Sequence, residues 1–296
     1  MLTGTVALTM ALALAPRGEP PDPVPHLDFR APAEMAAYAE RLDRVDRRRI
    51  AAVMRLVGLA DPGGAIRIVL APEGSEIANA SPAWVVGYTR GRGGVIVLFP
   101  ERAPSYPHDS LEELLQHEIA HVLIARAAAG RPVPRWFHEG LATTAEHVWG
   151  FGDRARFVYE VARRGSVPIP ELDALFDGSR GSVIVAYSLA GAFMSEMLVE
   201  HGSDWPARVL ARVAQGQRFG EAFRSVTGVS IATASDGFWR RHRLVAVWLP
   251  WATSPSTMWS VITLLALLAI VQVRRRRTAR RLQWEMEEGP DAAHEL

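Results

Sequence analysis

The feature that most constrains this chain is a run of nineteen residues, 255–273, that contains no charged side chain. As a helix, this run would be about 28 Å long, which is close to the hydrocarbon thickness of a bilayer. Three tryptophans, Trp248, Trp251 and Trp259, gather at its start, and four consecutive arginines, residues 274–277, follow its end. Aromatic residues are typical of membrane interfaces and arginines of the cytoplasmic side. The run therefore predicts one C-terminal transmembrane helix with the C-terminus in the cytoplasm.

A second apolar segment lies at the N-terminus. Residues 1–15 end in Ala13-Leu14-Ala15, a small-residue pattern typical of signal-peptide cleavage sites, and five prolines follow within residues 16–25. No basic residue precedes the apolar stretch and Pro16 would follow the cut, so an uncleaved segment is the alternative. The organisation we expect is a signal peptide (1–15), a Pro-rich linker (16–32), a folded domain (33–243), a juxtamembrane segment (244–254), the transmembrane helix (255–273) and a cytoplasmic tail (274–296).

Composition excludes several kinds of chemistry. The chain has no cysteine, which rules out disulfides, thiolate metal sites, iron–sulfur clusters and cysteine catalysis. All 33 of its basic residues are arginine, which rules out a lysine nucleophile, a Schiff base or a P-loop lysine. The net charge is +1, so no overall field favours nucleic acid as a partner. The basic run 47–49 is expected to be a solvated helix face beside Asp43 and Asp46.

Hydrophobic periodicity predicts an α+β domain with a small β-sheet on its N-terminal side and a mostly helical remainder. A helix is expected over 33–59 and an alternating strand over 66–70. Two apolar runs, 84–88 and 95–99, are separated by a glycine-rich loop and predict a hairpin. The second of these strands could bind an extended peptide if it lies at a sheet edge. Amphipathic helices are expected further on, over 188–201 and 205–215.

The chemically informative segment is the helix that Ser110 is predicted to cap. Glu113 lies three residues after Ser110, which is the spacing of a capping box, and the helix is expected to run to about residue 129. His117 and His121 lie one turn apart on its face, so both imidazoles can bind one metal ion. Glu118 lies beside them, where it can act on a metal-bound water. The alternative is a pair of core histidines satisfied by hydrogen bonds.

A catalytic zinc site needs a third protein ligand and an open position for water. A second helix is expected to begin near Pro134, a residue that is tolerated in a first turn. This helix carries Glu139 and Glu146 seven residues apart on one face, and His138 and His147 are further candidates. The spacing alone leaves the choice between the two glutamates open.

Residues 66–239 resemble the peptidase-MA-like family of gluzincin zinc metallopeptidases. The matching segments are His117-Glu118-Ile119-Ala120-His121 and Pro134-Arg135-Trp136-Phe137-His138-Glu139-Gly140-Leu141-Ala142, and a later stretch matches where Ala186-Tyr187-Ser188 opens a helix. The resemblance implies a zincin-like domain with Zn²⁺ held by His117, His121 and Glu139, and with Glu118 as the general base. It also implies Tyr187 as the donor that stabilises the oxyanion, and the alternative is that Tyr187 is a core or helix-start tyrosine. Tyr159 and His201 are further candidates for the donor. Gluzincins often carry an acidic residue one turn after the third ligand, where this chain has Thr143.

These features together predict a membrane-anchored zinc metallopeptidase. The arginines after the transmembrane helix and the N-terminal signal both place its domain outside the cytoplasm. Its partners would be the membrane and a peptide or protein substrate. One alternative is a membrane-tethered binding or scaffold protein with an inactive or structural metal site. Another is a zinc hydrolase that acts on a non-peptide amide.

Overall fold

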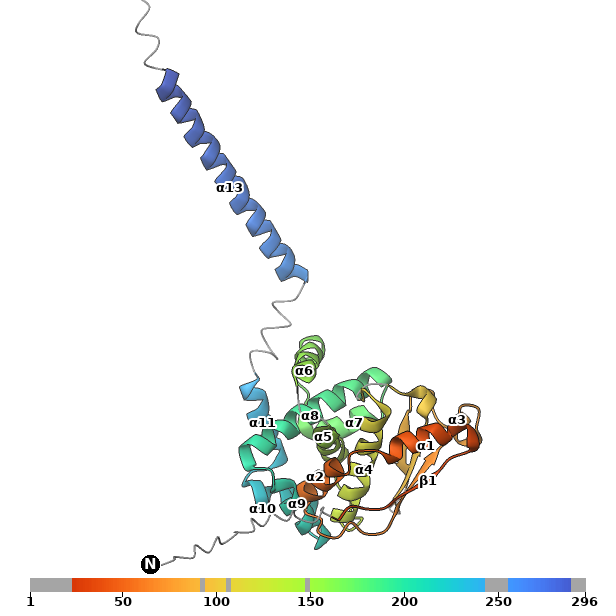
Figure 1. The fold of residues 1–296 in the computed structure, drawn as a ribbon. Helices are drawn as coiled ribbons and strands as arrows, with labels where there is room; N and C mark the ends of the chain where they lie inside the picture. The colour runs from red at the N-terminus through yellow and green to blue at the C-terminus, as the bar shows by residue number, and fades with distance from the viewer. Residues whose placement is uncertain (1–22, 91–93, 105–107, 147–149, 243–254, 289–296) are drawn as a thin grey trace, which may run out of the picture.

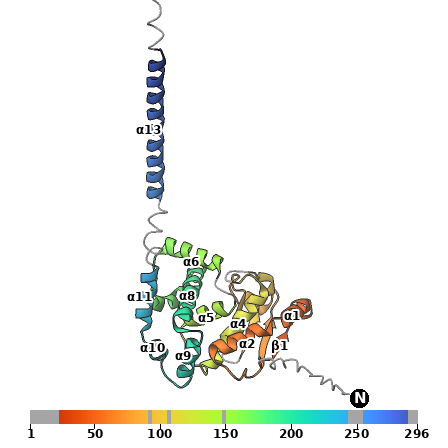
Figure 2. The ribbon, with the colours of Figure 1, turned by 60° about the vertical axis from the view of Figure 1, so that its left-hand side comes forward.

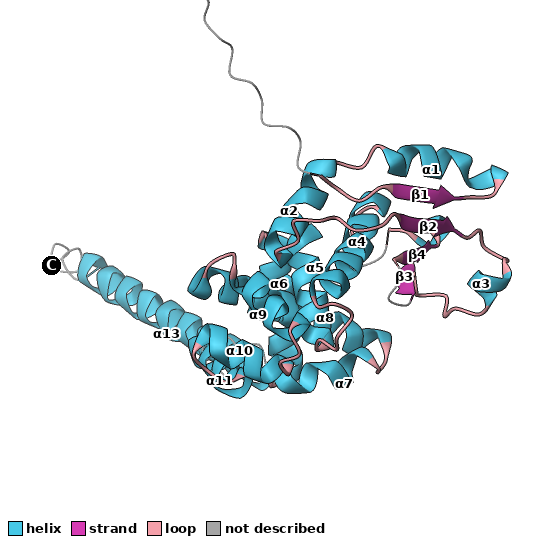
Figure 3. Cartoon of the chain, turned by 90° about the horizontal axis from the view of Figure 1, so that it is seen from below, coloured by secondary structure: helices cyan, strands magenta, loops and turns pink. Residues whose placement is uncertain are grey.

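A computed structural model describes residues 23–90, 94–104, 108–146, 150–242 and 255–288. The signal segment 1–15, the first part of the linker and the juxtamembrane segment 244–254 lie outside these residues. The chain is α+β, with a small four-stranded mixed sheet and a mostly helical remainder. Figures 1 and 3 show the sheet at one end of the domain and most helices at the other, with α4 (Leu111–Ala127) between them.

The sheet has the strand order β1-β2-β4-β3. Strands β1 (Leu27–Arg30), β2 (Ile66–Leu70) and β4 (Val95–Leu98) are parallel, and β3 (Gly87–Arg90) pairs antiparallel with β4. The predicted strand over 66–70 is confirmed, and the predicted pairing of the next two strands is confirmed with β3 displaced toward Arg90. In β4 three of the four apolar residues are buried, as is typical of a strand covered on both faces.

One expectation for the sheet is wrong, and one condition on it is not met. Residues 27–30, assigned to the linker 16–32, form β1 and pair in register with β2 from Leu27 opposite Ile66. The prolines before this segment indicate a linker, but the strand begins directly after them, and its first side chain, Leu27, is buried in the core. Peptide binding by residues 95–99 required that strand to lie at a sheet edge, but β4 lies between β2 and β3, and among the described residues the edges are β1 and β3.

The helix expected over 33–59 is divided into a 3-10 turn (Ala33–Met35), α1 (Ala36–Asp43) and α2 (Arg47–Val57). The break occurs because Asp46 caps α2: its side chain accepts a hydrogen bond from the backbone N–H of Arg48 at 2.9 Å. The Arg47 guanidinium pairs with Asp43 at 3.0 Å, which fits the predicted solvated face.

Helices α4, α5 (Arg135–Glu146) and α8 (Arg180–His201) form the centre of the domain. Ser110 caps α4 as predicted, because its hydroxyl accepts from the Glu113 backbone N–H at 3.1 Å. Helix α8 begins two turns before the Ala186-Tyr187-Ser188 segment that was expected to open it, so that expectation is wrong. Ser179, at the N-cap, accepts from the Ser182 backbone N–H and starts the helix earlier.

The remaining helices cover this centre. Figure 2 shows α6 (Phe151–Arg164) across α8 on the side opposite α9 (Trp205–Ala214) and α10 (Phe219–Thr227). Aromatic rings from α5, α8, α9 and α10 meet edge to face, with Trp136 and Phe193 centroids 5.4 Å apart. Shorter elements complete the domain: α3 (Glu76–Asn79), a 3-10 turn at Pro100–Arg102, another at Ile169–Glu171, α7 (Leu172–Phe176) and α11 (Ile231–Arg241).

Two helices in the described chain are long and apolar enough to cross a membrane by length and composition. The Arg180–His201 window, which is α8, is 61% buried within the domain. The Ser256–Arg277 window belongs to α13 (Pro255–Glu288), and none of it is buried (Figure 1). Of these two described helices, α13 is the one that lies wholly outside the domain core, and its start at Pro255 matches the predicted transmembrane run.

Candidate metal centre

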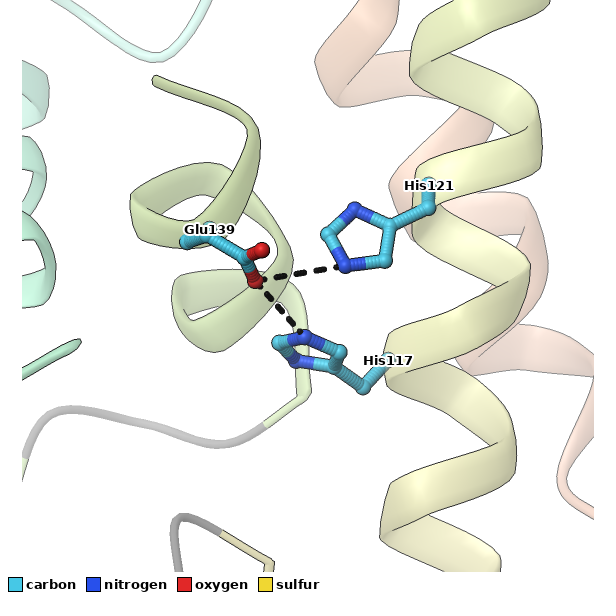
Figure 4. Close-up of side chains that lie close together, drawn as sticks. All are labelled: His117, His121 and Glu139. Carbon is cyan, nitrogen blue, oxygen red and sulfur yellow. Dashed lines mark hydrogen bonds and ion pairs between the residues drawn. The ribbon is translucent and has the colours of Figure 1, made fainter. Parts of the chain in front are cut away.

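The three predicted metal ligands converge on one point between α4 and α5 (Figure 4). The Nε2 atoms of His117 and His121 lie 3.2 and 3.3 Å from the same Glu139 oxygen, Oε2. One ligand atom from each side chain lies within 4.8 Å of the other two. The other candidate, Glu146, ends α5, and its side chain lies outside the described residues.

This spacing fits a metal ion. Ligand atoms about 2.0–2.1 Å from a tetrahedral zinc ion lie about 3.3 Å from each other, which matches the two nitrogen–oxygen separations. Two imidazole nitrogens and one carboxylate oxygen are a donor set found in catalytic zinc sites. The three side chains can therefore hold a metal ion, and three protein ligands would leave a fourth position for water or substrate.

The charge of the centre also favours a cation. Burial opposes the ionisation of Glu139, but the imidazoles of His121 and His117 outweigh this effect. They hold the pKa of Glu139 well below its usual value. This carboxylate is therefore anionic although it is only 7% exposed. A buried carboxylate needs a positive partner, and a bound metal ion would supply one.

Glu118 lies next to the cluster but does not belong to it. It follows His117 on α4, is buried, and its Oε2 accepts a hydrogen bond from the Thr89 hydroxyl at 2.7 Å. Thr89 belongs to the edge strand β3, which packs along α4. The sheet thus holds one oxygen of this carboxylate, and the side chain lines the pocket beside the cluster.

A pocket of about 470 Å³ opens beside the cluster. Its walls come from residues 84–89, α4, α5 and α8, and they include Glu118, His121, Glu139 and Tyr187. The ring of Tyr187 lies 6.1 Å from that of His117. Burial, together with the negative charges of Glu139 and Glu118, raises the pKa of Tyr187 well above its usual value, so its hydroxyl remains a donor.

The other candidates for that donor lie elsewhere. Tyr159 is 61% exposed on α6, His201 ends α8, and neither lines the pocket. His147, which was a further candidate for the third metal ligand, lies outside the described residues. Among the candidates for the oxyanion donor, only Tyr187 therefore lies with the three ligands and Glu118.

Close packing fixes the position of Glu139. At the next residue, Gly140, an added Cβ would lie 2.7 Å from the carbonyl oxygen of Ala190 on α8. Only glycine allows α5 and α8 to approach so closely.

The N-terminus of α5 is capped by a residue far along the chain. Asp173 accepts hydrogen bonds from the backbone N–H groups of Arg135 and Trp136 at 3.1 and 2.7 Å.

Arg135 is the residue nearest to Glu139 that the sequence analysis missed. Its Nε lies 3.6 Å from Glu139 Oε1, the other oxygen of the carboxylate whose Oε2 lies near both histidines. The guanidinium is anchored by Asp177 at 2.9 Å and lies 4.9 Å from the centre of the Phe176 ring.

Thr143 is at the position where gluzincins often carry an acid. It is buried, and its hydroxyl has no hydrogen-bond partner among the described residues.

Two further histidines border the centre. His108 is buried two residues before the cap of α4, and its ring packs against that of His117 at 4.6 Å. His138 lies 5.6 Å from the His121 ring, and burial lowers its pKa to about 4, with His121 adding to the effect. His138 is therefore neutral at neutral pH. Both line the pocket, and neither belongs to the group of three ligands.

We expect Arg135→Met to lower zinc affinity about 10-fold, within the range typical of residues that orient a metal ligand. The change removes the cation that holds Glu139 Oε1 and touches neither histidine. Competition with a chromophoric chelator measures the affinity. Arg212→Met, at an exposed arginine on α9, is the matched control. Equal affinities in the two variants would show that Arg135 does not orient the ligand.

Comparisons of the chain with protein-family models, with curated proteins and with solved structures find no match. The gluzincin resemblance stays a prediction from the motifs.

Proposed function

We propose that this chain is a zinc metallopeptidase with a zincin-like domain that α13 anchors in a membrane. The observation that carries the proposal is the convergence of His117, His121 and Glu139 beside a pocket that also holds the Glu118 carboxylate. A metal ligand set and a separate, positioned base are the two parts that hydrolysis by an activated water requires.

Zinc, when bound, supplies an electrophile that acidifies water and polarises a carbonyl group. Glu118 Oε1 takes the proton of the attacking water and delivers it to the leaving amine, while Thr89 holds Oε2. The Tyr187 hydroxyl donates a hydrogen bond to the oxygen on which negative charge develops. Strand β3, the sheet edge beside the pocket, can bind an extended peptide through its backbone.

A structural metal site in a tethered binding protein is less well supported. Structural zinc sites are closed by four protein ligands, whereas the described residues bring three donors together on the wall of an open pocket. The position of β3 along that pocket favours a peptide over a small amide substrate, because a sheet edge recognises extended backbone.

The full chain in detergent is expected to cleave a mixed peptide library only when it carries metal. Treatment with a chelator should abolish cleavage, and one equivalent of Zn²⁺ should restore it. Mass spectrometry of the products measures both. A zinc-loaded chain that cleaves no peptide in the library, while it hydrolyses small amides, would favour the non-peptide alternative.

We also propose that α13 crosses the membrane and that the domain lies outside the cytoplasm. The chain has no cysteine, so single introduced cysteines report topology cleanly. A membrane-impermeant maleimide should label Ala80→Cys, an exposed site in the domain, on intact cells. A cysteine added after Leu296 should be labelled only after permeabilisation. The reverse pattern would overturn the orientation.

A further inference from the structure

One tryptophan of the domain differs from the others in its surroundings. Trp136 and Trp205 are buried in the core, and the indole N–H of Trp239 donates to the Val167 carbonyl oxygen at 2.9 Å. Trp84 is 44% exposed, and no hydrogen bond or ring contact joins its indole to another described residue. Exposure alone does not assign a role to a single apolar side chain, so the location of this indole decides what it can do.

Trp84 lies on the wall of the pocket beside the metal ligands. It begins the segment 84–89, which forms the strand side of that wall and ends at Thr89, whose hydroxyl donates to Glu118. Val183 and Ile184 of α8 add aliphatic surface to the lining of the same pocket. The pocket therefore combines an apolar part with the carboxylates and imidazoles of the metal end.

The turn that carries Trp84 is held by a largely buried arginine. The backbone N–H of Val85 donates to the Pro82 carbonyl oxygen at 2.9 Å, so Trp84 is the third residue of a tight turn. The Arg102 guanidinium donates to two carbonyl oxygens of this turn, Pro82 at 3.1 Å and Val85 at 3.0 Å. It also pairs with Glu73, and its side chain is only 10% exposed. The backbone under the indole is thus fixed, and a tryptophan side chain has few torsions to order when it binds a ligand.

The length of the wall places this indole away from the reacting bond. Thr89, which contacts Glu118, follows Trp84 by five residues. Five residues of extended chain span at most about 16 Å, and the turn at Trp84 shortens that path. A peptide that runs along β3 from the metal would therefore bring to the indole a side chain that is about two to four residues from the reacting bond.

Resting on the proposed function, we propose that Trp84 forms a subsite for a large apolar side chain of the peptide, with aromatic side chains preferred, about two to four residues from the reacting bond. The bound side chain packs on the exposed indole, because aromatic pairs are favourable beyond the apolar area that they bury. Val183 and Ile184 keep the lining of the pocket apolar. Trp84 is in this account a specificity-determining residue and takes no part in the chemical step.

Peptide hydroxamates test this subsite without turnover, because the hydroxamate group binds zinc directly. Two sets of fluorescent tetrapeptides carry the hydroxamate at the C-terminus or at the N-terminus, so that both directions along the wall are covered. Each set compares an all-alanine peptide with peptides that carry one phenylalanine at the second, third or fourth residue from the hydroxamate. Fluorescence polarisation measures binding to the zinc-loaded full chain. We expect one phenylalanine position to raise the affinity about 5-fold, the size typical of an aromatic pair.

The variant Trp84→Ala is the decisive comparison. It should remove the gain from phenylalanine and leave the affinity for the all-alanine probe unchanged. Trp84→Phe keeps an aromatic ring and should keep most of the gain. The matched control Tyr159→Ala removes an exposed aromatic ring of α6 that does not line the pocket, so it should behave as the wild type. Zinc content measured for each variant shows that the metal centre stays assembled.

Phenylalanine and alanine probes that bind equally well to a zinc-loaded wild-type chain would overturn the inference and leave the proposed function intact. The inference would also fail if Trp84→Ala weakened the binding of all probes alike, because Trp84 would then only support the fold of the pocket. A wild-type chain that holds zinc but binds no hydroxamate would contradict the open position at the metal and thus the proposed function itself.

Discussion

Glu118→Gln is expected to abolish peptide hydrolysis and to leave zinc bound. Among the described residues that line the pocket, this carboxylate is the one acidic group outside the ligand cluster, and one of its oxygens is already held by Thr89. Glutamine keeps the size of the side chain and an oxygen that Thr89 can bind, but it cannot take a proton from water. Loss of a general base costs about 10²- to 10⁴-fold in rate. The ratio kcat/KM, measured beside zinc content, gives the effect.

Glu113→Gln is a suitable control for this variant, because Glu113 lies on the same helix and its carboxylate accepts from the Asp109 backbone N–H outside the pocket. We expect this control to keep wild-type activity. A Glu118→Gln chain that is zinc-loaded and fully active would remove Glu118 from the mechanism. A Glu118→Gln chain that loses zinc would show that this residue supports the metal instead.

The second large effect is expected at Glu139. Glu139→Ala removes the carboxylate on which both imidazoles converge, and two histidines alone cannot complete a zinc site. Zinc affinity should fall more than about 100-fold, beyond the range expected for a residue that only orients a ligand. Chelator competition measures this change, and Glu139→Gln tests it without opening a cavity beside Gly140.

Glu146→Ala is the control on the same helix, because the sequence spacing allowed either glutamate to be the third ligand. It should keep the wild-type zinc affinity. The opposite result, with affinity lost in Glu146→Ala and kept in Glu139→Ala, would move the centre to the end of α5.

Local signals explain why much of this site could be predicted from the sequence. The Ser110 cap and the four-residue spacing of His117 and His121 act within one helix, so they determine both the helix and the shared face of the imidazoles. In β2 the alternation of apolar and polar residues is likewise a local signal, and it determines the strand. Spacing alone could not identify Glu139 as the third ligand, because Glu146 lies seven residues later on the same helix face. The motif resemblance favoured Glu139.

The missed residues depend on contacts between distant parts of the chain. Thr89 reaches Glu118 across 29 residues, and Asp173 caps α5 from 38 residues beyond Arg135. No local periodicity indicates such contacts. Arg135 lies one turn before Glu139, so its helical spacing could have indicated it as a partner of that carboxylate. The start of α8 is set by the Ser179 cap, whereas the tyrosine motif at 186–188 indicates a later start.

The most direct test of the account is the metal content of the purified full chain after stripping and reloading with Zn²⁺, combined with X-ray absorption at the zinc edge. The account predicts one zinc ion per chain, surrounded by nitrogen and oxygen at about 2.0–2.1 Å, since the chain has no cysteine sulfur to offer. A folded chain that takes up no zinc, or other metal, would contradict it and leave His117, His121 and Glu139 as a hydrogen-bonded core cluster.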